Sequence, residues 1–344
     1  MRAGGRWMRA VFAVVVVLAL LAGAPASSGQ AQERRITVLI WASTWNGVMK
    51  QLAEQFTKET GIGVDIEIEA SSMEGLAKLQ AMRGRPTVDV WFTAAGVAQL
   101  AGTTPGLLAP MPVDQISNWA DAIPGATTPT FAAAYYFPFG IVYRPDLVPN
   151  GKITAWEELW GPAFANKLAL PTPTLFQGRM LLVGTLLAGG NIDNIEPGLA
   201  KLQQLKKNVA FWFSSDPQAR KALAQGDVAV MVTSSSTIKT LADQGVRVEM
   251  VSPKPAPILF EGVTILKTGK EPLAAQFVNY VLSPQWQTTI TQVWNMGPVN
   301  KKVAPGGKFV SLLPKAGDQV TFDDAVVNER LGRWTDLFNA NVAK

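Results

Sequence analysis

The segment Ile36–Val64, ITVLIWASTWNGVMKQLAEQFTKETGIGV, constrains the fold more than any other part of the chain. Ile36–Trp41 is an apolar run typical of a strand that is buried on both faces. From about Asn46, apolar residues recur at helical spacing until Gly61, which favours a helix C-terminus. Val64–Ala70 then alternates as a second strand. This order predicts a parallel sheet, and in such sheets ligands bind in the loops that follow the strands.

The same alternation continues along the chain. Met73–Met82 is predicted as a helix and Val88–Phe92 as a third strand, with a further helix opening at Thr93–Gly96. The β-α-β-α-β-α order is typical of a doubly wound α/β sheet. Tyr135–Tyr143, YYFPFGIVY, is apolar and aromatic and contains Pro138 and Gly140. We interpret it as a segment that crosses between domains.

The later elements are predicted from the same patterns. The strands are expected at Lys167–Leu170, Asp227–Val232 and Phe260–Leu266, and the helices at Trp156–Trp160, Met180–Leu187, Ile195–Lys207, Asp216–Gln225, Pro272–Leu282 and Asp323–Asn339.

The first 31 residues have the pattern of an export signal. Arginines precede the apolar run Val11–Ala24, and small residues follow it. Cleavage after Ala26 or after Ala31 fits this pattern, and we favour Ala31. The run is shorter than the roughly 20 residues of a membrane span, although an uncleaved anchor is the alternative. We expect the mature protein to be exported and soluble.

The chain contains neither cysteine nor histidine. An N-terminal lipid on cysteine is therefore excluded, which favours free diffusion in a periplasm. Catalysis by Ser-His-Asp or Cys-His groups and histidine-based zinc sites are excluded as well. Without the three signal arginines, 28 basic and 26 acidic residues remain, with their signs interspersed. This balance gives no support to nucleic-acid binding. The 313 residues after Ala31 predict two domains.

Several segments spread along the chain carry a family resemblance. They are LAEQFTKETGIGV (Leu52–Val64), VDVWF (Val88–Phe92), FGIVYRPDLV (Phe139–Val148), ITAWEELWGPAFANKLAL (Ile153–Leu170), GDVAVMVTSSS (Gly226–Ser236), GVTILKTGKEPLAAQFVNYVLSPQWQ (Gly262–Gln287) and NMGPVN (Asn295–Asn300). In this order and spacing the chain resembles a bacterial periplasmic solute-binding protein of an ABC importer, in the spermidine/putrescine-binding group.

The resemblance implies a two-lobed periplasmic-binding-protein type II clamp, each lobe a mostly parallel sheet flanked by helices. The expected first lobe is 36–139 plus 266–305, and the second is 140–265 plus 306–344. Crossing strands near Pro138–Ile141 and Gly262–Ile265 would form the hinge. The implied protein is a monomer without cofactor or enzymatic activity. It closes on a small ligand and delivers it to an ABC permease in the inner membrane.

The candidate ligand-binding residues lie in loops at the ends of the predicted strands, where both lobes would face the cleft, except Glu261, which comes from the segment that crosses between the lobes. They are Thr44, Trp45, Ser71, Ser72, Thr93, Thr172, Thr233, Ser234, Ser235 and Glu261.

Two of these candidates resemble ligand contacts of the polyamine-binding group. Trp45 resembles an aromatic residue that clamps the alkyl chain, because a ring face attracts a cation and desolvates methylenes. Glu261 falls where that group carries an acid that pairs with an amine. The alternative is that Trp45 packs in the core and that Glu261 faces water or pairs with Lys267.

Other functions remain open from the sequence. No acid lies near Pro171–Thr174, and hydroxyl-rich loops also suit an anionic ligand such as a phosphonate or carboxylate. The same serines and threonines are ordinary helix N-caps. Tyr135-Tyr136 invites comparison with ferric-binding proteins, although the pair is displaced from its position in that group. A secreted hydrolase is disfavoured because no GxSxG motif occurs. A periplasmic sensor with the same clamp has no distinguishing sequence feature.

Overall fold

The computed structural model describes residues 34–41, 45–294, 296–307, 309–315 and 317–344. The expected signal peptide and Thr44 lie outside the described residues, as does the side chain of Trp45. The described chain is an α/β fold whose strands follow the order β2-β1-β3-β10-β5-β8-β6-β7. None of the described helices is long and apolar enough to cross a membrane.

The N-terminal strand–helix alternation is confirmed. β1 pairs in parallel with β2 on one side and with β3 on the other, because each connecting helix returns the chain to the same end of the sheet. β3 runs two residues further than expected, so Thr93 and Ala94 are strand residues paired with β10. The elements are β1 (Arg35–Trp41), α1 (Trp45–Thr60), β2 (Gly63–Glu69), α2 (Ser72–Ala81), β3 (Val90–Ala94) and α3 (Ala95–Gly102).

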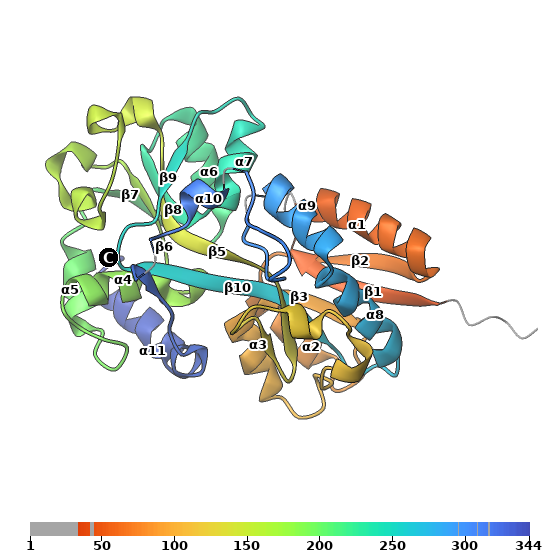
Figure 1. The fold of residues 1–344 in the computed structure, drawn as a ribbon. Coiled ribbons are helices and arrows are strands. Elements are labelled where there is room, and N and C mark those ends of the chain that lie inside the picture. Colours follow the sequence, from red (N-terminus) through yellow and green to blue (C-terminus); the bar gives the residue numbers. More distant parts are fainter. Residues whose placement is uncertain (1–33, 42–44, 295, 308, 316) are drawn as a thin grey trace, which may run out of the picture. The chain divides into compact units, whose positions relative to one another are not determined.

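Two long antiparallel strands, β5 (Phe131–Tyr143) and β10 (Ala256–Ile265), connect the strands into two groups. β10 pairs with β3, whereas β5 pairs with β10 up to Pro138 and with β8 from Phe139 onward. β5 therefore does cross between the groups, but as one unbroken strand. Figure 1 shows both strands running through the middle of the fold. We call β1, β2, β3, β10 and their helices the first group.

The second group contains β6, β7, β8 and β9 with the helices α4 to α7. β6 pairs in parallel with β7 and β8, and β8 and β9 run antiparallel to β5. β7 was not expected. Its sequence VAFWF lacks the alternation of apolar and polar residues that would distinguish a strand from a continuation of the preceding helix. The elements are β6 (Leu168–Pro171), α4 (Arg179–Leu187), α5 (Glu196–Gln203), β7 (Val209–Phe213), α6 (Asp216–Gln225), β8 (Val230–Ser234), α7 (Ser236–Ala242) and β9 (Glu249–Val251). The helix expected at Trp156–Trp160 is a 3-10 helix.

The C-terminal region returns to both groups. α8 (Glu271–Val281) and α9 (Pro284–Trp294) cover the first group, and a buried aromatic cluster of Phe92, Phe277 and Trp286 joins them to β3. The remaining elements are β4 (Thr127–Thr128), which pairs with β5, β11 (Gln319–Val320), which pairs with β10, α10 (Phe309–Leu312) and α11 (Asp324–Asn341).

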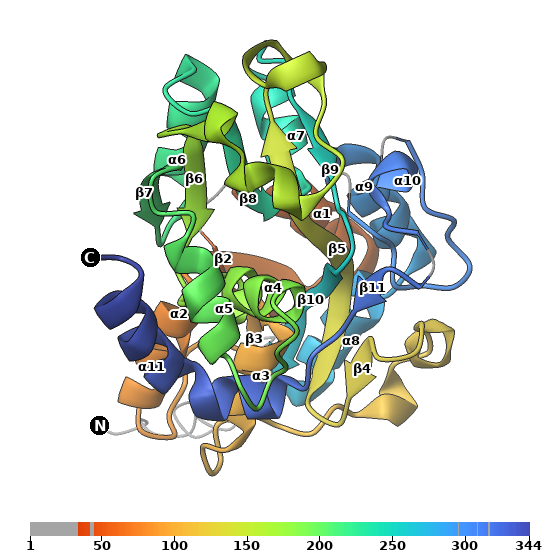
Figure 2. The same ribbon diagram turned by 90° about the vertical axis from the view of Figure 1, so that its left-hand side faces the viewer.

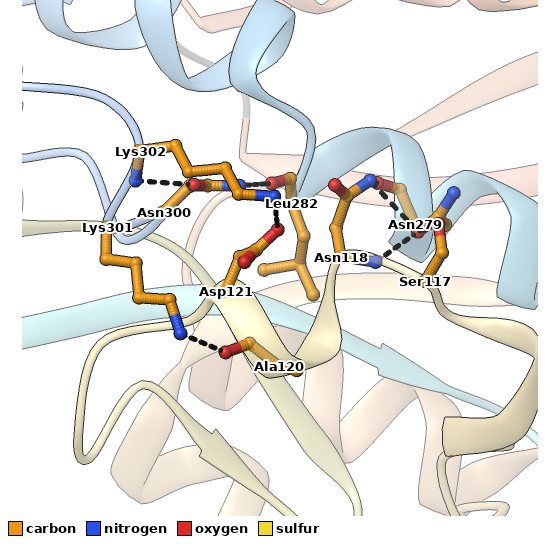
Figure 3. A network of polar contacts seen from close by, with 9 residues as sticks. All are labelled: Ser117, Asn118, Ala120, Asp121, Asn279, Leu282, Asn300, Lys301 and Lys302. Carbon is orange, nitrogen blue, oxygen red and sulfur yellow. Dashed lines mark hydrogen bonds and ion pairs between the residues drawn. The ribbon is translucent and has the colours of Figure 1, made fainter.

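A polar network fixes the segment that follows α9 (Figure 3). Asn300 donates to the carbonyl of Leu282 at 2.8 Å, and Lys302 forms an ion pair with Asp121 at 2.6 Å. Beside them the Asn118 amide donates to the Asn279 side chain at 3.0 Å. The Asn300 amide thus satisfies a carbonyl at the end of α8, and the Lys302–Asp121 ion pair ties the same segment to the residues before β4.

Candidate functional site

Glu261 lies at the boundary between the two groups. It is a cross-strand partner of Ala94 in β3 and of Tyr135 in β5, and the strand register shifts between Glu261 and Gly262. A Cβ atom on Gly262 would lie 2.1 Å from the carbonyl oxygen of Ala132, so glycine is needed for this close approach. Such a bulge redirects the neighbouring side chain. The bulge therefore helps to set the direction of the Glu261 carboxylate.

Tyr135 and Asp216 surround this carboxylate. The hydroxyl of Tyr135, whose side chain is fully buried, donates a hydrogen bond to Glu261 Oε2. Burial raises the pKa of Glu261 to about 7, the Tyr135 hydrogen bond lowers it, and the negative charge of Asp216 raises it again. Burial and the Glu261 charge also raise the pKa of Tyr135 well above its ordinary value. Tyr135 therefore stays a protonated donor at physiological pH.

Asp216 brings a second acid from the second group. It opens α6 directly after β7, where parallel strands present their loops to a ligand. Thr233 Oγ1 on β8 donates to both of its carboxylate oxygens at 3.4 Å. Burial raises the pKa of Asp216, while Arg220 one turn along the helix and the Thr233 hydrogen bond lower it. Two carboxylates from opposite groups thus lie close enough for one to affect the ionisation of the other.

Aromatic rings lie beside Tyr135. Phe137 lies 6.2 Å from Tyr135 between ring centroids and 6.5 Å from Phe176 of the second group. Phe176 and Gln177 both have left-handed backbone angles, with φ of +51° and +49°. Such angles cost energy in residues other than glycine and are found where the surrounding structure enforces them. This strained turn places an aromatic ring and the start of α4 at the boundary between the groups.

The first-group serines have structural bonds. Ser71 is the N-cap of α2 and accepts from the Glu74 amide at 3.2 Å. Ser72 Oγ accepts from the Trp41 indole at 3.2 Å and from the Ala94 amide at 3.2 Å, which ties α2 to β1 and β3. Ser71 therefore follows the N-cap interpretation, Ser72 instead links neighbouring elements, and the ligand role of both stays a prediction.

The remaining hydroxyl candidates lie at the ends of β3, β6 and β8. Thr93 Oγ1 is buried and has no hydrogen-bond partner among the described residues. Thr172 bonds to Thr174 at 2.9 Å, and Ser234 bonds to Ser236 at 2.9 Å. Ser235 Oγ donates to Met296 Sδ at 3.7 Å, across the two groups. Of the sequence candidates, Thr233 bonds to Asp216, and Glu261 lies near enough to Asp216 for that charge to raise its pKa.

The adjacent tyrosines do not form a pair. Successive side chains of a strand point to opposite faces, so Tyr135 faces Glu261 whereas Tyr136 packs toward Gly297 and Phe260. Within the described residues, acidic side chains do not gather in groups of three that could hold a metal ion. The carboxylate oxygens at Glu261 accept hydrogen bonds, so they instead suit a cation that donates them.

The sequence interpretation missed Asp216 because it did not recognise the strand that precedes this residue. Asp216 was placed at the start of a helix, but the strand before it was not recognised, so its loop was not counted among the strand-end loops. The aromatic run VAFWF followed by Ser-Ser-Asp-Pro is the signal that would have found it.

Comparisons with known proteins identify the family. The family model for bacterial extracellular solute-binding proteins matches residues 51–316. A gamma-aminobutyric acid-binding protein of Pseudomonas aeruginosa is 23% identical over 313 residues, covering 87% of this chain and 84% of that protein. Spermidine/putrescine-binding periplasmic protein 1 of Haemophilus influenzae is 25% identical over 271 residues, covering 73% of this chain and 72% of that protein.

Solved structures agree on the fold. The spermidine/putrescine ABC transporter substrate-binding protein of Streptococcus pneumoniae superposes with a TM-score of 0.72 at 20% identity, over 89% of this chain and 98% of that one. An ABC transporter substrate-binding protein of Bradyrhizobium japonicum gives a TM-score of 0.76 at 17% identity, over 88% and 99%. The expected two-lobed periplasmic-binding fold is confirmed. The chain belongs to the bacterial extracellular solute-binding protein family.

Proposed function

We propose that this family member binds a small amine-bearing solute, as a cation, between Asp216 and Glu261. The observation that supports this most directly is that the Asp216 carboxylate of the second group lies near enough to the buried Glu261 carboxylate for its charge to raise the pKa of Glu261. Burying like charges together is costly unless a counter-charge joins them. An ammonium group supplies that charge and three donors. Binding there would join the two groups and so favour the closed arrangement.

The surroundings of the pair suit an alkyl amine. Phe176 is partly buried and packs against the fully buried Phe137, so its remaining ring surface at this boundary can desolvate methylenes and attract a cation. Trp45, the first residue of α1 after β1, is proposed to add a further ring. The relatives named for gamma-aminobutyric acid and for spermidine and putrescine are named for ligands that all carry an amine.

An anionic ligand is less well supported. The hydroxyl hydrogens of Thr233 and Ser235 are already donated to the Asp216 carboxylate and to Met296 Sδ, so neither is available to an anion. Asp216 and Glu261 would repel an anion placed beside them.

The proposal includes the cellular role. The N-terminal signal would export the chain to the periplasm, where it acts without catalysis as a monomer. The lobes would be 36–139 plus 266–305 and 140–265 plus 306–344, hinged on β5 and β10. The closed form would deliver its ligand to an ABC permease of the inner membrane.

Calorimetry with the protein cleaved after residue 31 tests this proposal. The probes are putrescine, spermidine and 4-aminobutyrate, with phosphonoacetate and glucose as non-amine probes. We expect binding of at least one amine, and Asp216→Asn or Glu261→Gln should weaken it by about 1.5–3 kcal/mol, the range for a charge-assisted hydrogen bond.

Glu249→Gln is the matched control. Glu249 also accepts from a tyrosine hydroxyl, that of Tyr143 at 3.2 Å, but it lies on β9 away from the pair. Its replacement should leave the dissociation constant unchanged. Binding of phosphonoacetate alone, or amine binding that neither Asp216→Asn nor Glu261→Gln weakens, would overturn the proposal.

A further inference from the structure

α11 lies against both groups. Figures 1 and 2 both show it beside α3 of the first group and α5 of the second. Its later turns belong with the second group, where Phe338 packs edge-on against Trp212 of β7 with ring centroids 4.8 Å apart. Its first turns reach further and meet the N-terminal ends of α3 and α4.

Two residues on one face of α11 make these contacts. Asp324 and Asn328 are four residues apart and therefore project from the same side of the helix. Asp324 forms an ion pair with the buried Arg179 at the start of α4, at 2.5 Å. Asn328 Nδ2 donates to the carbonyl of Gly96 in α3. One helix face thus holds the second group and the first group at once.

Gly96 is the residue that permits this contact. A Cβ atom at this position would lie 1.7 Å from Nε2 of Gln177 and 3.1 Å from Cβ of Asp324. The Gln177 amide is the end of a side chain and can turn aside, whereas Asp324 Cβ is attached to the α11 backbone and can move only with that helix. Even one methyl group on α3 would therefore displace the Gln177 side chain and press on the first turn of α11.

The contact between the groups also includes a feature that opposes closure. Gln177 is 7% exposed, and its Nε2 has no hydrogen-bond partner among the described residues. Separating the groups would return this amide to water, whereas closing them buries it unpaired. Packing at Gly96 and the Asn328 bond favour closure, and the Gln177 amide opposes it. The contact between the groups therefore contains opposing contributions, and a ligand that binds the closed form adds to those that favour closure.

We propose that Gly96, Gln177 and Asn328 form a latch that sets how far the clamp closes without ligand. Gly96→Ala and Asn328→Ala weaken the latch and populate an open form. Gln177→Met keeps the size of the side chain but removes the unpaired amide, so it populates the closed form. Because ligand binds the closed form, Gly96→Ala should raise the apparent dissociation constant by about 10-fold, in proportion to the lost closed population.

A spin-label distance measurement tests the latch without any ligand. The chain has no cysteine, so Lys58→Cys on α1 and Lys221→Cys on α6, both exposed, provide one label on each group. Gly96→Ala and Asn328→Ala should lengthen the mean distance between the labels, and Gln177→Met should shorten it or narrow its distribution. Gly102→Ala is the matched control, because it lies on the same helix and its Cβ would meet nothing within 4 Å.

Unchanged distance distributions in all three variants would overturn the latch. Far-UV circular dichroism of each variant separates opening from unfolding, and Asn328→Ala keeps the test valid if Gly96→Ala does not fold. This readout uses no ligand, so the latch and the proposed amine specificity succeed or fail separately.

Discussion

Tyr135 and Glu261 are direct cross-strand partners on β5 and β10, and the Tyr135 hydroxyl donates to the Glu261 carboxylate. The bond links the two strands that connect the groups, directly beside a register shift. A donor in this position stabilises the ionised form of an acid whose burial opposes ionisation. Tyr135 therefore prepares Glu261 to receive a cation.

Replacing this donor should weaken ligand binding in a pH-dependent way. In Tyr135→Phe the pKa of Glu261 rises above its value of about 7, so less carboxylate is present at neutral pH. We expect amine binding to weaken by about 10-fold at pH 7, equal to roughly 1.4 kcal/mol for one hydrogen bond, and to recover partly at pH 9. Titration calorimetry at both pH values measures this. A loss of equal size at pH 7 and pH 9 would contradict the role of Tyr135 in ionisation.

Cation binding should also release protons. Near pH 7 Glu261 is about half protonated, and a bound ammonium favours its ionised form. We expect release of about half a proton at pH 7, none at pH 9, and an affinity that rises between pH 6 and pH 8. Calorimetry in phosphate and Tris buffers reports the release as a difference in binding heat. Equal heats in both buffers at pH 7 would count against it, and Glu261→Gln should abolish the difference.

Glu69 should make stability depend on pH. It is 2% exposed at the end of β2, and the Trp91 indole donates to both of its carboxylate oxygens at 3.1 Å. Burial raises its pKa to about 8 from 4.5. The folded state therefore holds this proton between pH 4.5 and 8 while the unfolded state loses it, so Glu69 lowers stability as pH rises through that window.

The neutral variant Glu69→Gln removes this effect. Its free energy of unfolding relative to the parent should improve by roughly 2–4 kcal/mol between pH 5 and pH 8. Urea unfolding at the two pH values measures the change, with Glu54→Gln on the exposed face of α1 as the control. A difference between Glu69→Gln and the parent that stays constant with pH would show that Glu69 is ionised in the folded state.

Gln287 should contribute strongly to stability. Its amide donates to the carbonyls of Ala134 and Val281 at 2.8 Å each, and its carbonyl accepts from the Val299 amide at 2.6 Å. Gln287→Leu leaves three buried backbone groups unpaired, at a cost of about 3 kcal/mol or more. Chemical denaturation measures it, and exposed Gln285→Leu on the same helix is the control. A cost below that of the control would mean that water replaces all three bonds.

Local pattern was sufficient for much of the fold. The first β-α-β unit follows from the spacing of apolar residues in Ile36–Val64, and the core of β8 and the long α11 follow from similar patterns. The observed boundaries of an element differ from the predicted ones where a neighbouring strand pairs with additional residues. β3 continues to Ala94 because β10 supplies partners at Glu261 and Gly262. Such partners are distant in sequence, so a local pattern cannot show them.

The sequence by itself determined the elements, the family resemblance and the importance of Glu261 as a candidate. Only the tertiary structure decided which groups meet Glu261: Tyr135, 126 positions earlier in the chain, and Asp216. It also showed that Ser71 caps α2, whereas in the sequence a serine at this position is compatible with capping and with ligand binding alike. The physical reason is that periodicity records which face of an element is buried, whereas the pairing of buried charges depends on strand register and on how distant segments pack.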